Sequence, residues 1–177
     1  MKRVLVVTVG VVLVLSGCAS MTQPATTGNT AVAELKNANG QTVGMATFTD
    51  GAGGVRIVME VKGLPPGAKG VHIHEVGKCE GPQFASAGGH FNPEKKQHGT
   101  MNPQGAHAGD LPNVTVGADG SGRLETTTNR VTVGSGASSL FDADGSALVI
   151  HAAADDFLTD PTGNSGGRTA CGVIVKK

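Results

Sequence analysis

Histidine is the residue type whose placement says most about the chemistry of this chain. The chain has six histidines, and all but one lie in the segment 70–110. They are His72, His74, His90, His98 and His107, and Asp110 closes the segment. The sixth, His151, lies far downstream. Neutral imidazole is the commonest protein ligand for copper and zinc, so this distribution predicts a metal centre. The fold must then bring His151 back to the segment.

His72 and His74 are two positions apart in an apolar stretch that predicts a strand. Side chains at this spacing project from the same face of a strand, with Cα atoms about 6.6 Å apart, so the two imidazoles can chelate one metal ion. The pair alone would equally fit a partly buried polar face. His151 ends a second apolar run, and it is placed to complete a site with the pair.

A second possible ligand set lies in the glycine-rich loop that follows. His90, His98, His107 and Asp110 are spaced H-x7-H-x8-H-x2-D. Three imidazoles and one carboxylate form a closed tetrahedral set suited to zinc, with no open position for a substrate. The metal would therefore have a structural or electrostatic role. The alternative is a set of solvated loop residues, which would leave a loop of more than thirty residues with little to order it.

The elements that must position these residues are short strands. From residue 31 onward, apolar alternations are separated by Gly, Pro, Asn and Asp, and no amphipathic helix is evident. The pattern predicts about eight strands, at 31–36, 42–49, 55–62, 71–76, 113–117, 122–128, 147–151 and 172–176. Two long irregular stretches, 79–113 and 152–168, interrupt them. This arrangement indicates an all-β antiparallel sandwich or barrel.

Bulk composition agrees with one β-rich domain. The chain has 177 residues, 28 glycines and neither Trp nor Tyr. This length allows a single domain with a real core, and this composition is typical of a loop-rich β protein. The formal net charge is zero. Charge therefore gives no argument for a nucleic-acid partner, and we expect none.

The N-terminus predicts export. Two basic residues precede a short apolar run at 4–15, and the sequence Leu-Ser-Gly-Cys then ends at Cys18. This resembles a bacterial lipobox, although an ordinary cleavage site near Ala19 is the alternative. The predicted parts are a signal peptide at 1–17, lipidated Cys18 with a flexible tether at 18–30, and a folded domain at 31–177. We expect an exported, extracytoplasmic protein, anchored by its lipid to a membrane at the cell surface or in the periplasm.

Two further cysteines remain once Cys18 carries lipid. Exported compartments are oxidising, so Cys79 and Cys171 are predicted to form a disulfide. Two free buried thiols, or a ligand role for Cys79, are the alternatives.

A family resemblance now emerges from fragments that occur in order over the chain from about residue 31 to its end. They are GVHIHEVGKC, SAGGHFNP, QHG, GAHAGDLPN, ALVIHAAADD and GNSGGRTACGVI. Together they resemble the copper/zinc superoxide dismutases, especially the bacterial exported forms. The resemblance implies an eight-stranded antiparallel Greek-key β-barrel with a metal-binding loop and an electrostatic loop. It also implies dismutation of superoxide to oxygen and hydrogen peroxide by one-electron cycling of a copper ion, next to a structural zinc.

The resemblance also implies a role for each site residue. Copper would be bound by His72, His74, His90 and His151, and zinc by His90, His98, His107 and Asp110. The chain would thus hold one ion of each metal, with the His90 imidazolate as the bridge. His90 would also leave copper on reduction and deliver a proton to the product.

Three further positions match residues that support the family site. Asp155 matches a carboxylate that links a copper ligand to a zinc ligand. Arg168 matches the catalytic arginine that draws superoxide into the copper channel. Cys79 and Cys171 match the family disulfide.

The chain departs from the family pattern just after His151. Many relatives have charged residues there, whereas residues 152–154 are all alanine. We expect Lys95 and Lys96 to replace part of the missing positive field. The alternative function is a non-catalytic, dismutase-like protein for copper or zinc storage or delivery. A missing copper ligand or a replaced arginine would favour it, and neither is seen. A monomer and a homodimer both fit the sequence.

Overall fold

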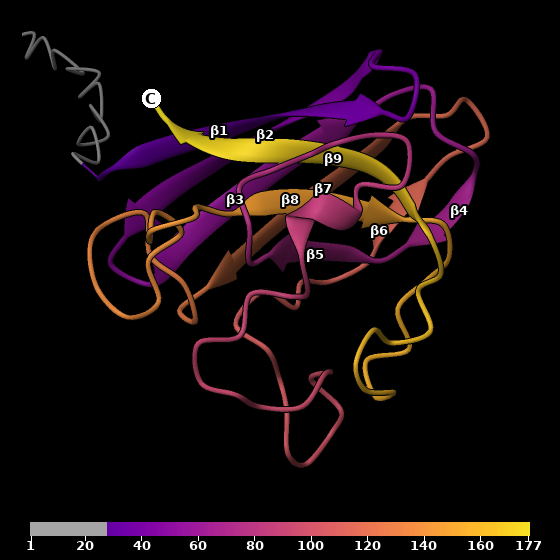
Figure 1. The fold of residues 1–177 in the computed structure, drawn as a ribbon. Coiled ribbons are helices and arrows are strands. Elements are labelled where there is room, and N and C mark those ends of the chain that lie inside the picture. Colours follow the sequence, from indigo (N-terminus) through magenta and orange to yellow (C-terminus); the bar gives the residue numbers. More distant parts are fainter. Residues whose placement is uncertain (1–27) are drawn as a thin grey trace, which may run out of the picture.

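The computed structural model describes residues 28–177, which form an all-β fold with one short 3₁₀ helix (Figure 1). The predicted signal peptide, the lipidation site Cys18 and most of the tether lie outside the described residues. The elements are β1 Thr30–Asn37, β2 Thr42–Gly51, β3 Gly54–Val61, β4 Gly67–Lys69, β5 Val71–His74, η1 Ala85–Ala87, β6 Val114–Val116, β7 Gly122–Thr128, β8 Ala147–His151 and β9 Arg168–Lys176.

The strands form a nearly closed barrel. Their order in the sheet is β4-β6-β7-β3-β2-β1-β9-β8-β5, and all neighbours are antiparallel. The two ends of this order, β4 and β5, are separated in the chain by Gly70 alone. One interrupted strand therefore pairs with β6 on one side and with β8 on the other. Counted in this way, the eight predicted strands are all present, and the predicted fold class is confirmed.

The connections are of the Greek-key type. β1, β2 and β3 follow one another as hairpins, and the first turn contains the pair Asn39-Gly40, in which Gly40 has φ 75°, as a tight hairpin turn requires. The later strands instead pair with partners far away in the sequence: β7 with β3, β9 with β1 and β8 with β5.

Most strand boundaries differ from the prediction by one or two residues, and the largest difference is at the start of β9. β9 begins at Arg168 rather than at residue 172, and β5 ends at His74 rather than at residue 76. At the start of β9, Ala170 packs in the barrel core while Cys171 packs in a second apolar cluster outside it. Because both faces of the strand are covered there, no polar residue alternates with the apolar ones, and the sequence pattern is lost.

The two long loops leave the barrel on the same side, the lower side in Figure 1. The loop 75–113, the predicted metal-binding loop, connects β5 to β6, and the loop 152–167, the predicted electrostatic loop, connects β8 to β9. A disulfide between Cys79 and Cys171 joins the first loop to β9 across a sequence separation of 92. Closing a loop of this length stabilises the fold by roughly 2–4 kcal/mol. Among residues 28–177, no helix is long and apolar enough to cross a membrane.

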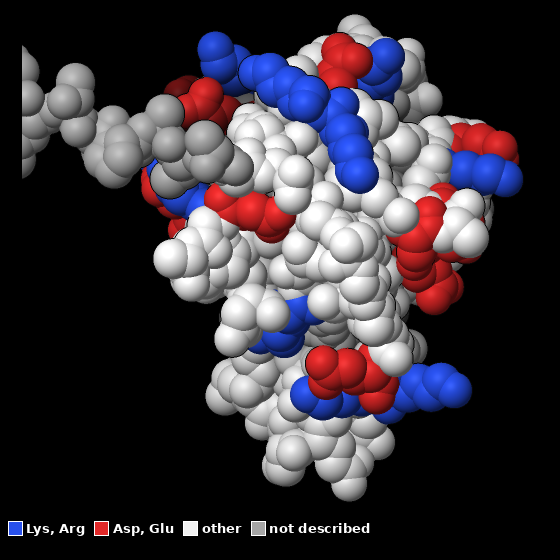
Figure 2. All heavy atoms as spheres, turned by 90° about the vertical axis from the view of Figure 1, so that its left-hand side faces the viewer, with Lys and Arg blue, Asp and Glu red and all other residues white. Residues whose placement is uncertain are grey.

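Charges of both signs are mixed over the surface. Figure 2 shows acidic and basic side chains close together, with broad uncharged areas between them. On the outer face of β3 and β7, Arg123 pairs with Glu60 and Glu125, and Arg56 also pairs with Glu125. Exposed pairs of this kind contribute little to stability, but they keep this side of the barrel polar.

Candidate metal centre

The β5–β8 pair and the loop ends beside it bring four histidines together. His72 and His74 alternate along β5 with Val71 and Ile73, which pack in the core, so both imidazoles lie on the opposite face. The main-chain N–H of His151, at the end of β8, donates to the carbonyl of Gly70 at 2.9 Å. The loop residue His90 forms an isolated β-bridge with His74. One nitrogen from each of the four rings lies within 4.8 Å of the others.

Each of these four rings has a buried nitrogen without a hydrogen-bond partner. The atoms are Nδ1 of His72 and Nε2 of His74, His90 and His151. The opposite nitrogens of three rings donate to oxygen: His72 to Asp155 at 2.6 Å, and His74 and His151 at 3.0 Å to the carbonyls of Gly88 and Gly166. Such bonds fix the tautomer and leave the inward nitrogen as a lone pair. Four converging lone pairs without a donor fit a cation, and imidazole suits copper.

A second set converges on the other side of His90. Its atoms are Nδ1 of His90, His98 and His107 and Oδ1 of Asp110. Nδ1 of His90 lies 3.3 Å from that of His98 and 3.3 Å from that of His107. Asp110 Oδ1 lies 3.0 Å from His90, 3.1 Å from His98 and 3.3 Å from His107. Zinc bonds of about 2.0 Å in a tetrahedron require ligand atoms about 3.3 Å apart, so these four residues fit zinc.

A looser grouping within 4.8 Å places His72, in place of His107, with His90, His98 and Asp110. We favour His107 because its contacts with His90 and Asp110 are both 3.3 Å, the tetrahedral spacing. In addition, Nε2 of His72 is already bonded to Asp155. His90 is thus the shared ring, with Nδ1 in the second set and Nε2 in the first.

Comparison with known proteins shows the family of this chain. The family model for copper/zinc superoxide dismutase (SODC) matches residues 42–174. The chain belongs to the copper/zinc superoxide dismutase family. It is 47% identical to copper-zinc superoxide dismutase 1 of Aquifex aeolicus over 144 residues, covering 80% of this chain and 85% of that protein. It is 44% identical to copper-zinc superoxide dismutase of Deinococcus radiodurans over 174 residues, covering 92% and 90% of the two chains.

Solved structures share the fold of this chain. The crystal structure of a SOD-like protein from Bacillus subtilis superposes with a TM-score of 0.78 at 42% identity, covering 81% of this chain and 97% of that chain. The clock protein EA4 has a TM-score of 0.71 at 39% identity, covering 87% and 98%. The barrel of the dismutase family is therefore also found in proteins with other names.

Burial keeps the copper-side histidines of this dismutase neutral. It lowers the pKa of His72 to about 3, that of His74 to about 2 and that of His151 to about 4. Removing an imidazolium from water is costly, and neighbouring rings repel a second charge. The three rings are therefore unprotonated near neutral pH and can bind a cation without first releasing a proton.

The zinc side has a different electrostatic balance. Burial opposes charge on His98, but hydrogen bonds to Asp110 and Asp155 prevail and raise its pKa to about 9. Burial would also raise the pKa of Asp110, yet hydrogen bonds from His107, His90 and His98 hold it well below its usual range. The carboxylate is thus ionised, as a metal ligand must be. In the metal-free protein, His98 carries a proton that zinc would displace.

Asp155 links the two sides. Its Oδ2 accepts a bond of 2.6 Å from Nε2 of His72, and its Oδ1 lies 3.0 Å from Nε2 of His98. Two residues that sequence reasoning missed hold Asp155. The side-chain amide of Asn113 accepts a hydrogen bond from the main-chain N–H of Asp155 and donates one to its main-chain carbonyl. Gly163 packs so closely that a Cβ there would collide with the carboxylate of Asp155. Asn113 lies within the fragment GAHAGDLPN, but nothing in that fragment shows which residue its amide contacts.

Arg168 lies next to the copper-side residue His151. It pairs with His151 across β8 and β9, and its Nη1 and Nη2 donate to the carbonyls of Phe84 and Gly88 at 2.5 Å each. These two carbonyls flank η1 in the disulfide-linked loop. Arg168 also lines a cleft of about 500 Å³ with Pro82, Gln83, Ala85, Gly166 and Gly167. Its guanidinium is therefore oriented by the first loop while it faces solvent from β9.

The electrostatic loop begins without charged side chains. Residues 152–154 are exposed alanines. Of the two lysines expected to compensate, Lys96 forms an ion pair with Glu94 at 2.6 Å, which weakens its field. Lys69, which sequence reasoning missed, instead donates to the main-chain carbonyl of Ala152 at 2.7 Å. This places an ammonium group directly beside the residue that follows His151.

Proposed function

We propose that this chain is a superoxide dismutase that converts superoxide to oxygen and hydrogen peroxide with one copper and one zinc ion. The observation that carries the proposal is the sharing of His90. Its Nε2 faces a set of buried histidine nitrogens without hydrogen-bond partners, while its Nδ1 completes a set with tetrahedral spacing. A single-metal storage site would not need one ring placed between two complete ligand sets.

The proposed ligands follow from the two sets. Copper would be held by His72, His74, His90 and His151, and zinc by His90, His98, His107 and Asp110. Bound at the first set, copper supplies one-electron redox chemistry, which zinc lacks.

The residues around the centre would perform the remaining tasks. Arg168 is always charged, and its remaining N–H groups can bind and orient a small anion at the mouth of the cleft. His90 would hold a proton at Nε2 and pass it to the product at the same position. Asp155 orients His72 and His98 so that both ligand sets keep their geometry. Because the six histidines are at most 7% exposed, bulk water is excluded from the centre, which lies between the outer face of β5 and the long loops.

Metal analysis of the purified full chain, measured together with superoxide dismutation, tests the proposal. We expect one copper and one zinc per chain and a fast, cyanide-sensitive reaction. His74→Ala should retain zinc and lose copper, whereas His107→Ala should lose zinc first. A wild-type protein that binds zinc but refuses copper on reconstitution would overturn the proposal. It would favour the alternative, a non-catalytic metal-binding protein for storage or delivery.

We further propose that the protein is exported and anchored by lipid on Cys18, at the cell surface or in the periplasm. The supporting observations are the Leu-Ser-Gly-Cys sequence and the apolar run before it. A cysteine pair joined at Cys79 and Cys171 suits an oxidising compartment. Cys18→Ser should release the protein from the membrane fraction of the native host. Retention of this variant would contradict the anchor.

A further inference from the structure

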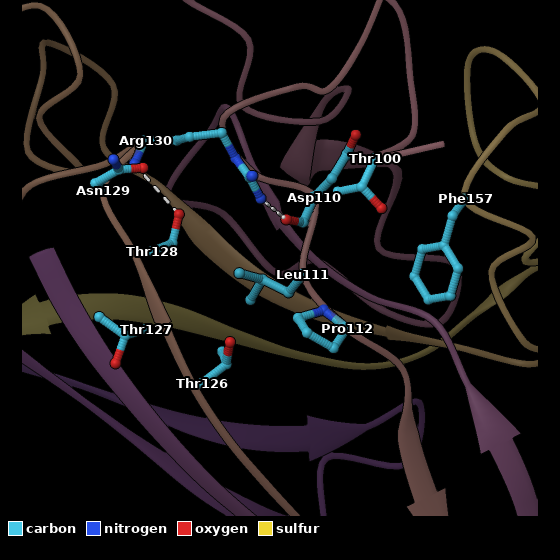
Figure 3. A pocket seen from close by; sticks show the side chains of 10 residues that line it. All are labelled: Thr100, Asp110, Leu111, Pro112, Thr126, Thr127, Thr128, Asn129, Arg130 and Phe157. Atoms are coloured by element: carbon cyan, nitrogen blue, oxygen red, sulfur yellow. Dashed lines mark hydrogen bonds between the residues drawn. The ribbon is translucent and has the colours of Figure 1, made fainter. Parts of the chain in front are cut away.

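We infer that Arg130 is a positioning residue for the zinc ligand Asp110. Arg130 lies just after β7, on the barrel and outside the metal-binding loop. Its Nη2 donates to the main-chain carbonyl of Asp110 at 2.5 Å (Figure 3). A hydrogen bond from a charged guanidinium is about twice as strong as one between neutral groups. This inference rests on the proposed zinc site and names a residue that controls it.

Asp110 is the residue of the zinc set with the most contacts. Its Oδ1 belongs to the tetrahedral set, while its Oδ2 accepts the main-chain N–H groups of Gly99 at 2.9 Å and His107 at 3.0 Å. These bonds hold the carboxylate from inside the metal-binding loop. Arg130 holds the main chain of the same residue from the barrel. The carboxylate can keep a fixed position relative to the strands only if its backbone is anchored to them.

A cleft lies between the backbone of Asp110 and β7. It has a volume of about 360 Å³, and its lining includes Leu111 and Pro112 on one side and Thr126 on the other. In Figure 3, the side chain of Arg130 reaches along this cleft to Asp110. Beside this cleft, Leu111 packs in the barrel core and Asp110 forms an isolated β-bridge with His72 of β5. The guanidinium of Arg130 adds a connection from the β7 side to the main chain of Asp110.

The surroundings of Arg130 differ from those of Arg56 and Arg123 and resemble those of Arg168, which also donates to main-chain carbonyls. Arg56 and Arg123 form ion pairs with glutamates on the outer face. Within residues 28–177, Arg130 has no carboxylate within ion-pair distance, and its Nε is buried without a partner. Partly burying a cation without a carboxylate costs free energy. Charge pairing does not explain why an arginine occupies this position. Holding the main chain of Asp110 does explain it.

The test compares zinc binding by Arg130→Met, Arg130→Lys and the matched control Arg123→Met. Arg123 lies on β7, the strand that ends two residues before Arg130, and its guanidinium pairs with glutamates on the outer face. Copper-free protein is titrated with zinc alone against a competing chelator, and the visible d–d bands are recorded after loading with cobalt alone. Metal-free proteins are also unfolded in urea, which separates global stability from metal binding.

We expect Arg130→Met to bind zinc about 10–100-fold more weakly and to shift the cobalt bands, because groups that orient ligands contribute on this scale. Arg130→Lys should recover part of the loss, and Arg123→Met should bind like wild type. Zinc affinity within twofold of wild type and an unchanged cobalt spectrum in Arg130→Met would overturn the inference. If Arg130→Met does not fold, the same outcome in Arg130→Lys and Arg130→Gln would overturn it. A wild-type protein that does not bind zinc would instead overturn the zinc site itself.

Discussion

The side-chain amide of Asn113 holds the main chain of Asp155 by two hydrogen bonds of 2.9 Å, one donated and one accepted. Asn113 lies just before β6, at the end of the metal-binding loop, and Asp155 lies in the electrostatic loop. The two loops are therefore joined directly behind the carboxylate that contacts both His72 and His98. Movement of one loop would displace a group shared by both metal sites.

Replacing this amide should affect both metals together. In Asn113→Ala, both bonds to Asp155 are lost, and we expect the free energy of unfolding to fall by about 1–3 kcal/mol. Copper and zinc affinities should each fall by roughly tenfold, because Asp155 orients one ligand of each. Asn113→Asp keeps an acceptor but no donor and should have a smaller effect. Chelator competition with each metal measures the change, and a loss confined to one metal would contradict the shared role.

Gly163 offers a matched comparison with Gly40. Both residues have positive φ, 62° and 75°. A Cβ on Gly163 would lie 2.6 Å from Nε2 of His98 and closer still to Asp155, whereas one on Gly40 would contact nothing within 4 Å. We expect Gly40→Ala to lose only the backbone preference, about 1–2 kcal/mol. Gly163→Ala should lose more stability and also bind zinc more weakly. Equal urea midpoints and equal zinc affinities in Gly163→Ala and Gly40→Ala would contradict the close packing of Gly163 against His98 and Asp155.

The stability of the metal-free protein should depend on pH in two opposite ways. The pKa values of His72, His74 and His151 fall from 6.5 to about 3, 2 and 4 on folding. Between these values and 6.5 the unfolded chain binds more protons, so stability decreases as the pH falls below about 6.5. The pKa of His98 rises to about 9, so its contribution is complete below 6.5 and is lost as the pH rises through about 9.

We therefore expect maximal stability of the metal-free protein near neutral pH. Below it, each of the three rings contributes a slope of up to about 1.4 kcal/mol per pH unit. Chemical unfolding of chelator-treated protein between pH 4 and pH 10 measures the profile. His98→Gln should remove the decrease on the alkaline side. A profile that is flat from pH 4 to pH 7 would show that the copper-side rings are not buried as neutral groups.

Arg168 should control the rate without controlling the metal content. Arg168→Met removes the cation from the mouth of the cleft, and we expect the second-order rate to fall by roughly 10–1,000-fold. Arg168→Lys keeps the charge but loses the planar fork that holds Phe84 and Gly88, so its rate should be intermediate. Copper and zinc content serve as the control and should be unchanged. A rate within twofold of wild type in Arg168→Met would exclude the proposed role.

The lysines near the centre can be compared by the salt dependence of the rate. Changing Lys95 and Lys96 together to Glu should lower the rate and flatten its dependence on ionic strength. Because Lys96 is already paired with Glu94, we expect Lys69→Met to have an effect at least as large for a smaller change of charge. Rates measured from low to high salt show which of these lysines contributes to the guidance of superoxide. An unchanged rate at low salt would remove the lysines concerned from the guidance of superoxide.

Sequence reasoning located the strands whose outer faces are polar, because alternation marks them. It missed β4, which has only three residues, and the start of β9, where Ala170 and Cys171 are covered on both faces. The histidines and Asp110 could be predicted as site residues because their types and spacing are unusual. Asn113 and Arg130 could not be predicted, because they bond main-chain groups 42 and 20 positions away, and any residue type offers those groups.

All six histidines of the chain are buried in the metal centre. The described surface therefore displays no imidazole, the side chain whose ordinary pKa lies between pH 5 and 8. Its charge should stay nearly constant across that range, so the field met by an approaching anion would not change when the surroundings acidify. Any change of rate between pH 5 and 8 would then report events at the buried metal centre. The surface charge of the protein would therefore not depend on the acidity of its surroundings within this range.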